Sequence, residues 1–408
     1  MSHAAIASLP FPVIDNSLAP GGIPIARLAA RVGSTPFYVY DRAVLSQRMA
    51  ALRAAVPARV RIHYSLKANP MPALVQHMAG LADGFDVSSA GELKIALDST
   101  MPAGKISMTG PGKSEADLSR AVAAGVLIHL ESARELERVA RIGDRLGCMP
   151  RVALRVNPDF ELKSSGMRMG GGAKPFGIDA DQAPEVLRRI GAWGLDFHGL
   201  HIYSGSQCLR ADAIVEAQAQ AIALATRLAE HAPQPIRLLN IGGGFGVPYF
   251  PGESPLDLAP IGVSLARAVM DLQQSMPEAT LALELGRYLV SEAGVYVSRV
   301  IDRKVSRGQV FLVADGGLHH HLAASGNLGQ VIRKNYPVLI GNRVRSPHNE
   351  TVSVTGPLCT PLDVLADRVT LPAADVGDFV VVLQSGAYGL SASPAAFLGH
   401  PTAEEVMV

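Results

Sequence analysis

The sequence predicts a TIM (β/α)8 barrel followed by a β-sandwich or β-barrel-like domain. From about residue 61, short apolar or β-branched runs alternate with helical stretches rich in Ala, Leu, Arg and Glu. This alternation is typical of βα units and a parallel sheet. After about residue 288, the rhythm changes to Val-rich alternating runs separated by turn residues. The change predicts a second, all-β domain.

The βα region contains candidate strands in the number that closes a TIM barrel. They are expected at Arg61–Leu66, Gly84–Val87, Lys105–Met108, Val126–Leu130, Arg151–Val156, Phe197–Ile202, Ile236–Ile241 and Leu281–Glu284. Two of the helices between them, Ala90–Leu97 and Ser132–Leu146, begin at serines that can cap a helix. An open doubly wound sheet remains the structural alternative, because periodicity does not reveal closure.

These patterns divide the chain into three segments. Residues 1–40 are rich in Pro, Gly and Ala, carry a short strand at Phe37–Tyr40, and are interpreted as an arm that contributes to the β-domain. Residues 41–287 are the predicted barrel. Residues 288–408 are the predicted β-domain, with strands at Gly294–Val300, Val310–Val313, Thr351–Val354 and Asp378–Leu383.

Composition excludes several classes of function. A net charge of +1 over 408 residues, with scattered basic residues, argues against nucleic-acid binding. No apolar run approaches the length of a membrane span, so we expect a soluble, cytoplasmic protein. The cysteines Cys148, Cys208 and Cys359 lie far apart, which fits a reducing compartment. We expect no metal site, since consecutive histidines at 319–321 point in different directions.

Polar residues follow the predicted strands at their carboxyl ends, where TIM barrels place their active sites. They are Lys67, Asp86, Arg155, His201, Ser204, the run Gly242–Gly246, Glu284 and Arg287. A glycine run after a buried strand allows backbone N–H groups to approach a phosphate, although a plain tight turn would look the same. Lys67 could likewise be an ordinary solvated lysine, and Glu284 could simply pair with Arg287.

Taken together, these residues meet the requirements of pyridoxal 5'-phosphate (PLP). A lysine supplies the amine for a Schiff base, the glycines supply phosphate donors, and a carboxylate keeps the pyridine nitrogen protonated. We therefore expect PLP as the cofactor, and a small-molecule substrate.

Spaced motifs in the same order resemble the fold-type III PLP-dependent decarboxylases of ornithine, arginine and diaminopimelate. The resemblance extends from about residue 36 to 398 and implies the alanine racemase-like arrangement of barrel and β-domain. It is carried by Tyr64–Pro70, Phe85–Ser89, Arg155–Pro158, His201–Gln207, Gly242–Gly246, Glu284–Arg287, Gly356–Cys359 and Gly386–Gly389.

The resemblance implies a role for each residue. Lys67 would form the internal aldimine, Glu284 would contact the pyridine nitrogen, and His201 would stack on the ring. Asp86 and Arg155 would line the cofactor pocket. The phosphate would be surrounded by Ser204, Gly243, Gly244, Arg287 and Tyr388. Cys359 would reach the site from the second subunit of a homodimer and protonate Cα after CO₂ leaves.

The substrate is less well defined. The resemblance implies substrate contacts from Asp363 and from an expected helix that carries Arg333 and Tyr336. In the family, an acidic residue directly after the catalytic cysteine holds the substrate's distal amine, but Thr360 stands there in this chain. The segments Ser165–Gly177 and Ser391–Pro401 are more similar to a subgroup of exosortase-associated decarboxylases and enzymes that act on an aminoacyl group carried on an acyl-carrier protein.

The sequence thus predicts a homodimeric PLP-dependent amino-acid α-decarboxylase. One alternative is a racemase or epimerase of the same architecture, although the Glu284 motif and Cys359 favour decarboxylation. The other alternative is a non-catalytic homologue that binds or regulates a partner, which the intact Lys67 and Glu284 oppose.

Overall fold

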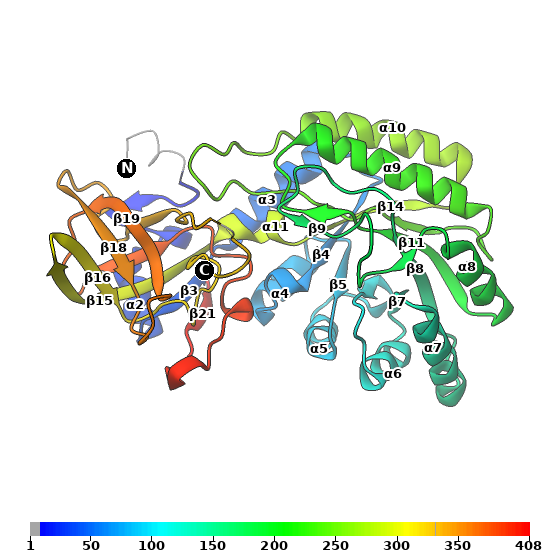
Figure 1. Cartoon of the computed structure of the whole chain (residues 1–408), viewed down its shortest axis with the longest axis horizontal. Coiled ribbons are helices and arrows are strands. Elements are labelled where there is room, and N and C mark those ends of the chain that lie inside the picture. Colours follow the sequence, from blue (N-terminus) through cyan, green and yellow to red (C-terminus); the bar gives the residue numbers. More distant parts are fainter. Residues whose placement is uncertain (1–8, 331) are drawn as a thin grey trace. The chain divides into compact units, whose positions relative to one another are not determined.

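The computed structural model describes residues 9–330 and 332–408 (Figure 1). The chain folds into two compact units. One comprises Arg48–Pro248 and Ser254–Tyr288, and is called the barrel unit below. The other, the β unit, comprises the residues up to Gln47, the short segment Tyr249–Glu253, and Leu289–Val408.

The barrel unit is a closed parallel β-barrel. Its eight strands run in the order β4, β5, β6, β7, β8, β11, β13 and β14, and parallel pairing of β14 with β4 closes the ring. Their bounds are β4 Arg61–Ser65, β5 Gly84–Val87, β6 Ile106–Met108, β7 Leu127–Leu130, β8 Arg151–Asn157, β11 Asp196–Ile202, β13 Leu238–Asn240 and β14 Thr280–Leu285. The predicted barrel is confirmed, and the open doubly wound sheet is wrong.

A helix follows each barrel strand and α3 precedes the first, and several of these helices are arranged around the barrel in Figure 1. They are α3 Arg42–Ala55, α4 Pro72–Ala79, α5 Ala90–Asp98, α6 Glu115–Ala124, α7 Ala133–Leu146, α8 Ala183–Ala192, α9 Ala211–Ala229, α10 Ala259–Ser275 and α11 Arg287–Val290. The predicted serine caps are confirmed: Ser89 accepts a hydrogen bond from the Glu92 N–H at 3.2 Å, and Ser132 accepts one from the Glu135 N–H at 3.1 Å.

Besides the barrel strands and their helices, the chain forms two short strand pairs and one strand that adds to β8. β10 (Ile178–Asp179) pairs in parallel with β8, and β9 (Met167–Arg168) pairs with β12 (Gly205–Ser206). Near the amino-terminal end of the described chain, β1 (Val13–Ile14) and β2 (Ser17–Leu18) form a hairpin that precedes α2 (Ile25–Val32).

The β unit is built around the long strand β15 (Gly294–Ser306). β15 pairs antiparallel with β16 (Gln309–Ala314), with β20 (Phe379–Val382) and with β3 (Phe37–Tyr40). The sheet order is β17, β20, β15, β16, β18 and β19, and β21 joins through β3. The remaining bounds are β17 Val338–Ile340, β18 Asn349–Thr355, β19 Val364–Pro372 and β21 Glu404–Met407.

Sequence patterns located some of this unit and missed other parts. β3, β15, β16, β18 and β20 overlap the runs predicted as strands, whereas β17, β19 and β21 were not predicted. The helix expected around Arg333 and Tyr336 is wrong, because residues 332–337 form no helix. No helix in the described part of the chain is long and apolar enough to cross a membrane.

Helices α3 and α10 are in close contact at Gly262, and a substitution there tests the packing of the barrel unit. A Cβ at Gly262 in α10 would lie 2.0 Å from the backbone oxygen of Ala55 at the end of α3. Replacing glycine by alanine inside a helix ordinarily stabilises by about 1 kcal/mol, but such an overlap costs about 1–3 kcal/mol or more.

We therefore expect Gly262→Ala to lower the free energy of unfolding, measured by urea denaturation. Gly112→Ala is the matched control, because its Cβ would meet no atom of the described residues within 4 Å. Stabilisation by Gly262→Ala would contradict the close packing of the two helices.

Candidate active site

The residues predicted from the strand ends collect at one end of the barrel. Lys67 lies in a 3-10 turn (Leu66–Ala68) directly after β4, and its side chain is exposed. Asp86, Arg155, His201 and Glu284 lie in β5, β8, β11 and β14. Ser204, Gly243 and Gly244 follow β11 and β13, and Arg287 begins α11. The barrel unit thus brings together all candidates predicted from its strands.

Glu284 is a buried carboxylate with three polar neighbours. Its side chain is 2% exposed. Oε1 accepts a hydrogen bond from the Ser65 hydroxyl, and Oε2 accepts one from the Asn240 amide, both at 3.2 Å. Oε2 also lies 3.1 Å from His201 Nε2. Burial alone would raise the pKa of Glu284, but the hydrogen bond from His201 and the charges of His201 and Lys67 hold it well below its usual range.

Asp86 is a second buried carboxylate at the same end of the barrel, and its pKa is raised where that of Glu284 is lowered. Burial and the charge of Glu284 raise the pKa of Asp86 well above its ordinary value, and Lys67 opposes this only in part. Two carboxylates pushed apart in this manner take different protonation states. Glu284 therefore keeps the negative charge, and Asp86 holds a proton more readily.

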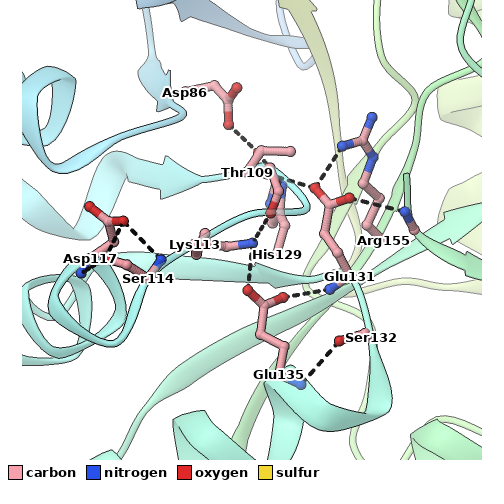
Figure 2. A network of polar contacts seen from close by, with 12 residues as sticks. Asp86, Thr109, Lys113, Ser114, Asp117, His129, Glu131, Ser132, Glu135 and Arg155 are labelled. Carbon is pink, nitrogen blue, oxygen red and sulfur yellow. Dashed lines mark hydrogen bonds and ion pairs between the residues drawn. The ribbon is translucent and has the colours of Figure 1, made fainter. Parts of the chain in front are cut away.

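A line of side chains runs from Asp86 through Thr109 to His129 (Figure 2). The Thr109 hydroxyl donates to Asp86 Oδ1 at 2.5 Å and lies 2.9 Å from His129 Nδ1. The Thr109 hydroxyl thus joins Asp86 to His129. The His129 ring lies 4.5 Å from the His201 ring, centroid to centroid. His129 thus supports the ring of His201 from within the barrel.

Arg155 is held by a separate buried ion pair. Its Nη1 lies 2.6 Å from Glu131 Oε1, and the side chains are 6% and 2% exposed. Glu131 also accepts backbone hydrogen bonds from Gly110 and Gly177, at 2.6 and 3.0 Å. Burial would raise the pKa of Glu131, but Arg155 and Lys113 lower it below the usual value.

A second buried pair continues this network, as Figure 2 shows. Lys113 Nζ lies 2.9 Å from Glu135 Oε1, with the two side chains 1% and 6% exposed. Glu135 Oε2 accepts the backbone N–H of Glu131 at 2.7 Å, which joins the two pairs. Removing one partner of such a buried pair leaves an uncompensated charge, so the network fixes the position of Arg155.

The glycine run after β13 has no room for side chains. Gly242 and Gly244 adopt φ angles of +70° and +81°, which favour glycine. A Cβ at Gly243 would lie 2.3 Å from the Glu284 carbonyl oxygen, and one at Gly244 would lie 2.8 Å from Leu162 Cδ2. The bare backbone beside a buried acid and an accessible lysine fits the phosphate, ring nitrogen and aldehyde of PLP.

The remaining predicted residues belong to the β unit. Cys359 is exposed, in the loop after β18. Tyr388 adopts a φ angle of +52°. Arg333 Nη2 donates to the Val364 carbonyl at 2.5 Å, and the Tyr336 ring lies 4.7 Å from that of Tyr249.

Asp363 has a structural task in that unit. Its Oδ1 accepts the Leu318 N–H at 2.6 Å, and its Oδ2 accepts the Leu358 N–H at 2.8 Å. The carboxylate thereby ties the Cys359 loop to a neighbouring segment. The two backbone hydrogen bonds give Asp363 a structural role that differs from the predicted contact with substrate.

Sequence reasoning missed the residues that hold the predicted ones in place. Ser65, Asn240, His129, Glu131 and Thr109 were not singled out. Part of their signal was present, because His129 and Asn240 are the polar residues of otherwise apolar strands. Thr109 and Glu131 directly follow β6 and β7, and Ser65 ends β4. Such residues in a buried strand need partners, and here the partners are one another or the predicted site residues.

Comparisons with known proteins agree with this chemistry. The family model of the pyridoxal-dependent decarboxylase pyridoxal-binding domain matches residues 42–291. An L-glutamyl-[BtrI acyl-carrier protein] decarboxylase from Niallia circulans is 39% identical over 91% of this chain and 88% of its own. The diaminopimelate decarboxylase of Aquifex aeolicus is 31% identical over 97% and 91%.

Solved structures of decarboxylases also resemble this chain in fold. A crystal structure of diaminopimelate decarboxylase from Helicobacter pylori, complexed with L-lysine, superposes with a TM-score of 0.83 at 26% identity and covers 94% of each chain. The sequence, the closed barrel and the buried acid beside an accessible lysine lead to one assignment: the chain belongs to the pyridoxal-dependent decarboxylases.

Proposed function

We propose that this PLP-dependent decarboxylase acts on an amino acid whose side-chain carboxyl is carried as a thioester on an acyl-carrier protein, so that the free α-carboxylate leaves as CO₂. The observation that carries the proposal is the absence of an available carboxylate next to Cys359 in the described chain. Thr360 occupies the position of the family's amine-binding acid, and both oxygens of Asp363 accept backbone N–H groups. A substrate with a distal ammonium would find no partner in this loop.

The relatives support this choice of substrate. The protein that is 39% identical acts on an L-glutamyl group on an acyl-carrier protein, whereas the diaminopimelate decarboxylases are about 30% identical. A glutamyl thioester has no distal ammonium, which matches the neutral Thr360.

The barrel unit supplies the groups for the cofactor. When bound, PLP provides an electron-withdrawing ring that accepts the electron pair left on Cα as CO₂ departs. Lys67 would carry the cofactor, and ionised Glu284 would hold a proton at the pyridine nitrogen. His201, supported by His129, would pack on the ring. Asp86 and Arg155 would line the pocket.

Backbone and side-chain donors would bind the phosphate. Gly243 and Gly244 expose N–H groups at a turn without side chains, and a phosphate needs such donors. Ser204, Arg287 and Tyr388 would complete this set.

Cys359 would deliver a proton to Cα after decarboxylation, from a second subunit of a homodimer. Its thiol is exposed in this chain and is therefore accessible to a partner. Proton delivery by a positioned group contributes about 10²–10⁴-fold to the rate.

The substrate proposal predicts a strong preference between free and carrier-bound amino acids. We expect the glutamyl thioester of a carrier protein to be decarboxylated at least about a hundredfold faster, in kcat/KM, than free glutamate, diaminopimelate or ornithine, because only the thioester brings the binding energy of the carrier. CO₂ release and product mass are the measurements. Rapid turnover of free diaminopimelate or ornithine would contradict the proposal without affecting the decarboxylase assignment.

The dimer proposal predicts complementation between two inactive variants. Lys67→Ala and Cys359→Ala should each lose nearly all activity. If each site combines Lys67 of one subunit with Cys359 of the other, mixed dimers formed by re-association contain one intact site. Activity should then recover to about one quarter of the wild-type value. The absence of recovery, with mixed dimers verified by differential tagging, would show that both residues act within one subunit.

The ion pair of Arg155 predicts a combined effect on stability and cofactor affinity. Glu131→Gln preserves volume but leaves Arg155 buried without its partner, so we expect the free energy of unfolding to fall by about 3 kcal/mol. PLP affinity, measured by the change in protein fluorescence, should fall as well. Glu137→Gln, which removes an exposed pair with Arg189, should change stability by less than about 0.5 kcal/mol. Equal effects from the two variants would refute the role of Glu131.

A further inference from the structure

A cavity of about 270 Å³ lies at the amino-terminal end of the barrel, opposite the candidate active site. It is lined by the first residues of several strands: Arg61 of β4, Ile106 of β6, Leu127 of β7, Arg151 of β8, Leu238 of β13 and Thr280 of β14. Because the strands are parallel, Arg61 and Thr280 open this mouth at the strand ends opposite Lys67, while His63 lies further inward and pairs in register with Glu284.

The lining is strongly positive. Arg61, Lys105, Arg151 and Arg237 all contribute to it, and Asp83 is the carboxylate among the described lining residues. Asp83 pairs with Arg61 at 3.4 Å and with Arg53, which lies outside the cavity, at 2.5 Å. Asp196 lies nearby and pairs with Arg237 at 2.5 Å. The four basic side chains of the lining thus have only Asp83 and Asp196 as acidic neighbours, and Asp83 also neutralises Arg53.

Arg151 is oriented without a direct acidic partner among the described residues. Its Nη1 donates to the carbonyls of Gly125 and Gly104 at 2.9 and 3.3 Å, and its Nε donates to His198 Nε2 at 3.2 Å. Burial lowers the pKa of Arg151, and Arg237 adds to the lowering while Asp196 opposes it. A fixed guanidinium with an uncompensated charge is a common feature of oxyanion sites.

A second, independent observation comes from His63. The residue is 9% exposed, lines the cavity, and has no hydrogen-bond partner at Nδ1 within the described chain. It lies two residues beyond Arg61 on β4, so both side chains are on the same face of the strand. A Cβ at Gly84 would come within 3.0 Å of the His63 ring, and the glycine leaves that ring its space. The Nδ1 nitrogen has no solvent-exposed surface, so the remainder of the imidazole ring, and not Nδ1, borders the cavity.

We propose that the amino-terminal mouth of the barrel binds a small oxyanion of the phosphate class, held by Arg61, Lys105 and Arg151, with the His63 ring at the inner end of the cavity. The volume suits an inorganic-sized anion and is below that of typical cofactor pockets of about 300–1,000 Å³. The site is independent of the PLP phosphate, which would bind at the opposite end of the barrel.

Inorganic phosphate is the probe, and PLP-loaded protein is used so that the cofactor's phosphate site is filled. We expect saturable binding by calorimetry. In the double variant Arg61→Gln/Lys105→Ala, binding should weaken by at least about tenfold. Both residues are exposed, so the fold should persist, as circular dichroism would verify. Arg120→Gln, which removes an exposed arginine elsewhere on the barrel unit, should leave the affinity unchanged.

The ring of His63 gives a readout that does not depend on activity. Phosphate should shift the His63 NMR signals, assigned by their loss in His63→Asn, and half-saturation should match the calorimetric value. Three results would overturn the proposal: no saturable binding up to about 10 mM phosphate, equal affinity in the double variant, or binding that leaves the His63 signals unmoved.

Discussion

The charge on Glu284 is the constraint around which the barrel interior is built. Placing an ionised carboxylate in a protein interior costs several kcal/mol unless donors surround it. Three strands besides its own supply them: Ser65 at the end of β4, Asn240 at the end of β13, and His201 in β11. The barrel satisfies this requirement because its parallel strands end at one level, where residues distant in sequence become neighbours.

The polar interior around this acid also explains why the site is rigid. Thr109 and His129 connect Asp86 with His201, while Glu131 and Glu135 compensate the charges of Arg155 and Lys113. Arg155 and Lys113 are each buried against a glutamate. Such an arrangement contributes little net stability but penalises any displacement of a member. The groups that would contact the cofactor are therefore fixed before it arrives.

The extent to which the sequence predicted this molecule depends on the range of the interactions involved. Strands of the barrel were located because each is a local run bounded by turn residues. Lys67, Asp86, His201 and Glu284 were predicted as site residues from their position at strand ends. Asn240 and His129 were missed, because their importance lies in partners on other strands. Charged residues in β19 interrupt its alternation of apolar and polar side chains, so the pattern did not indicate a strand. β21 is recognisable as a strand only through its pairing with β3.

The pairing of β3 has a consequence for how the chain folds during synthesis. β3 lies between β15 and β21, so its hydrogen bonds require residues 294–297 on one side and 404–407 on the other. All strands of the barrel precede both of these segments in the chain and leave the ribosome earlier. Domains generally fold as units while the chain emerges. The barrel can therefore close while β3 still exposes two unpaired edges, and the β unit becomes complete only after residues 404–407 have emerged.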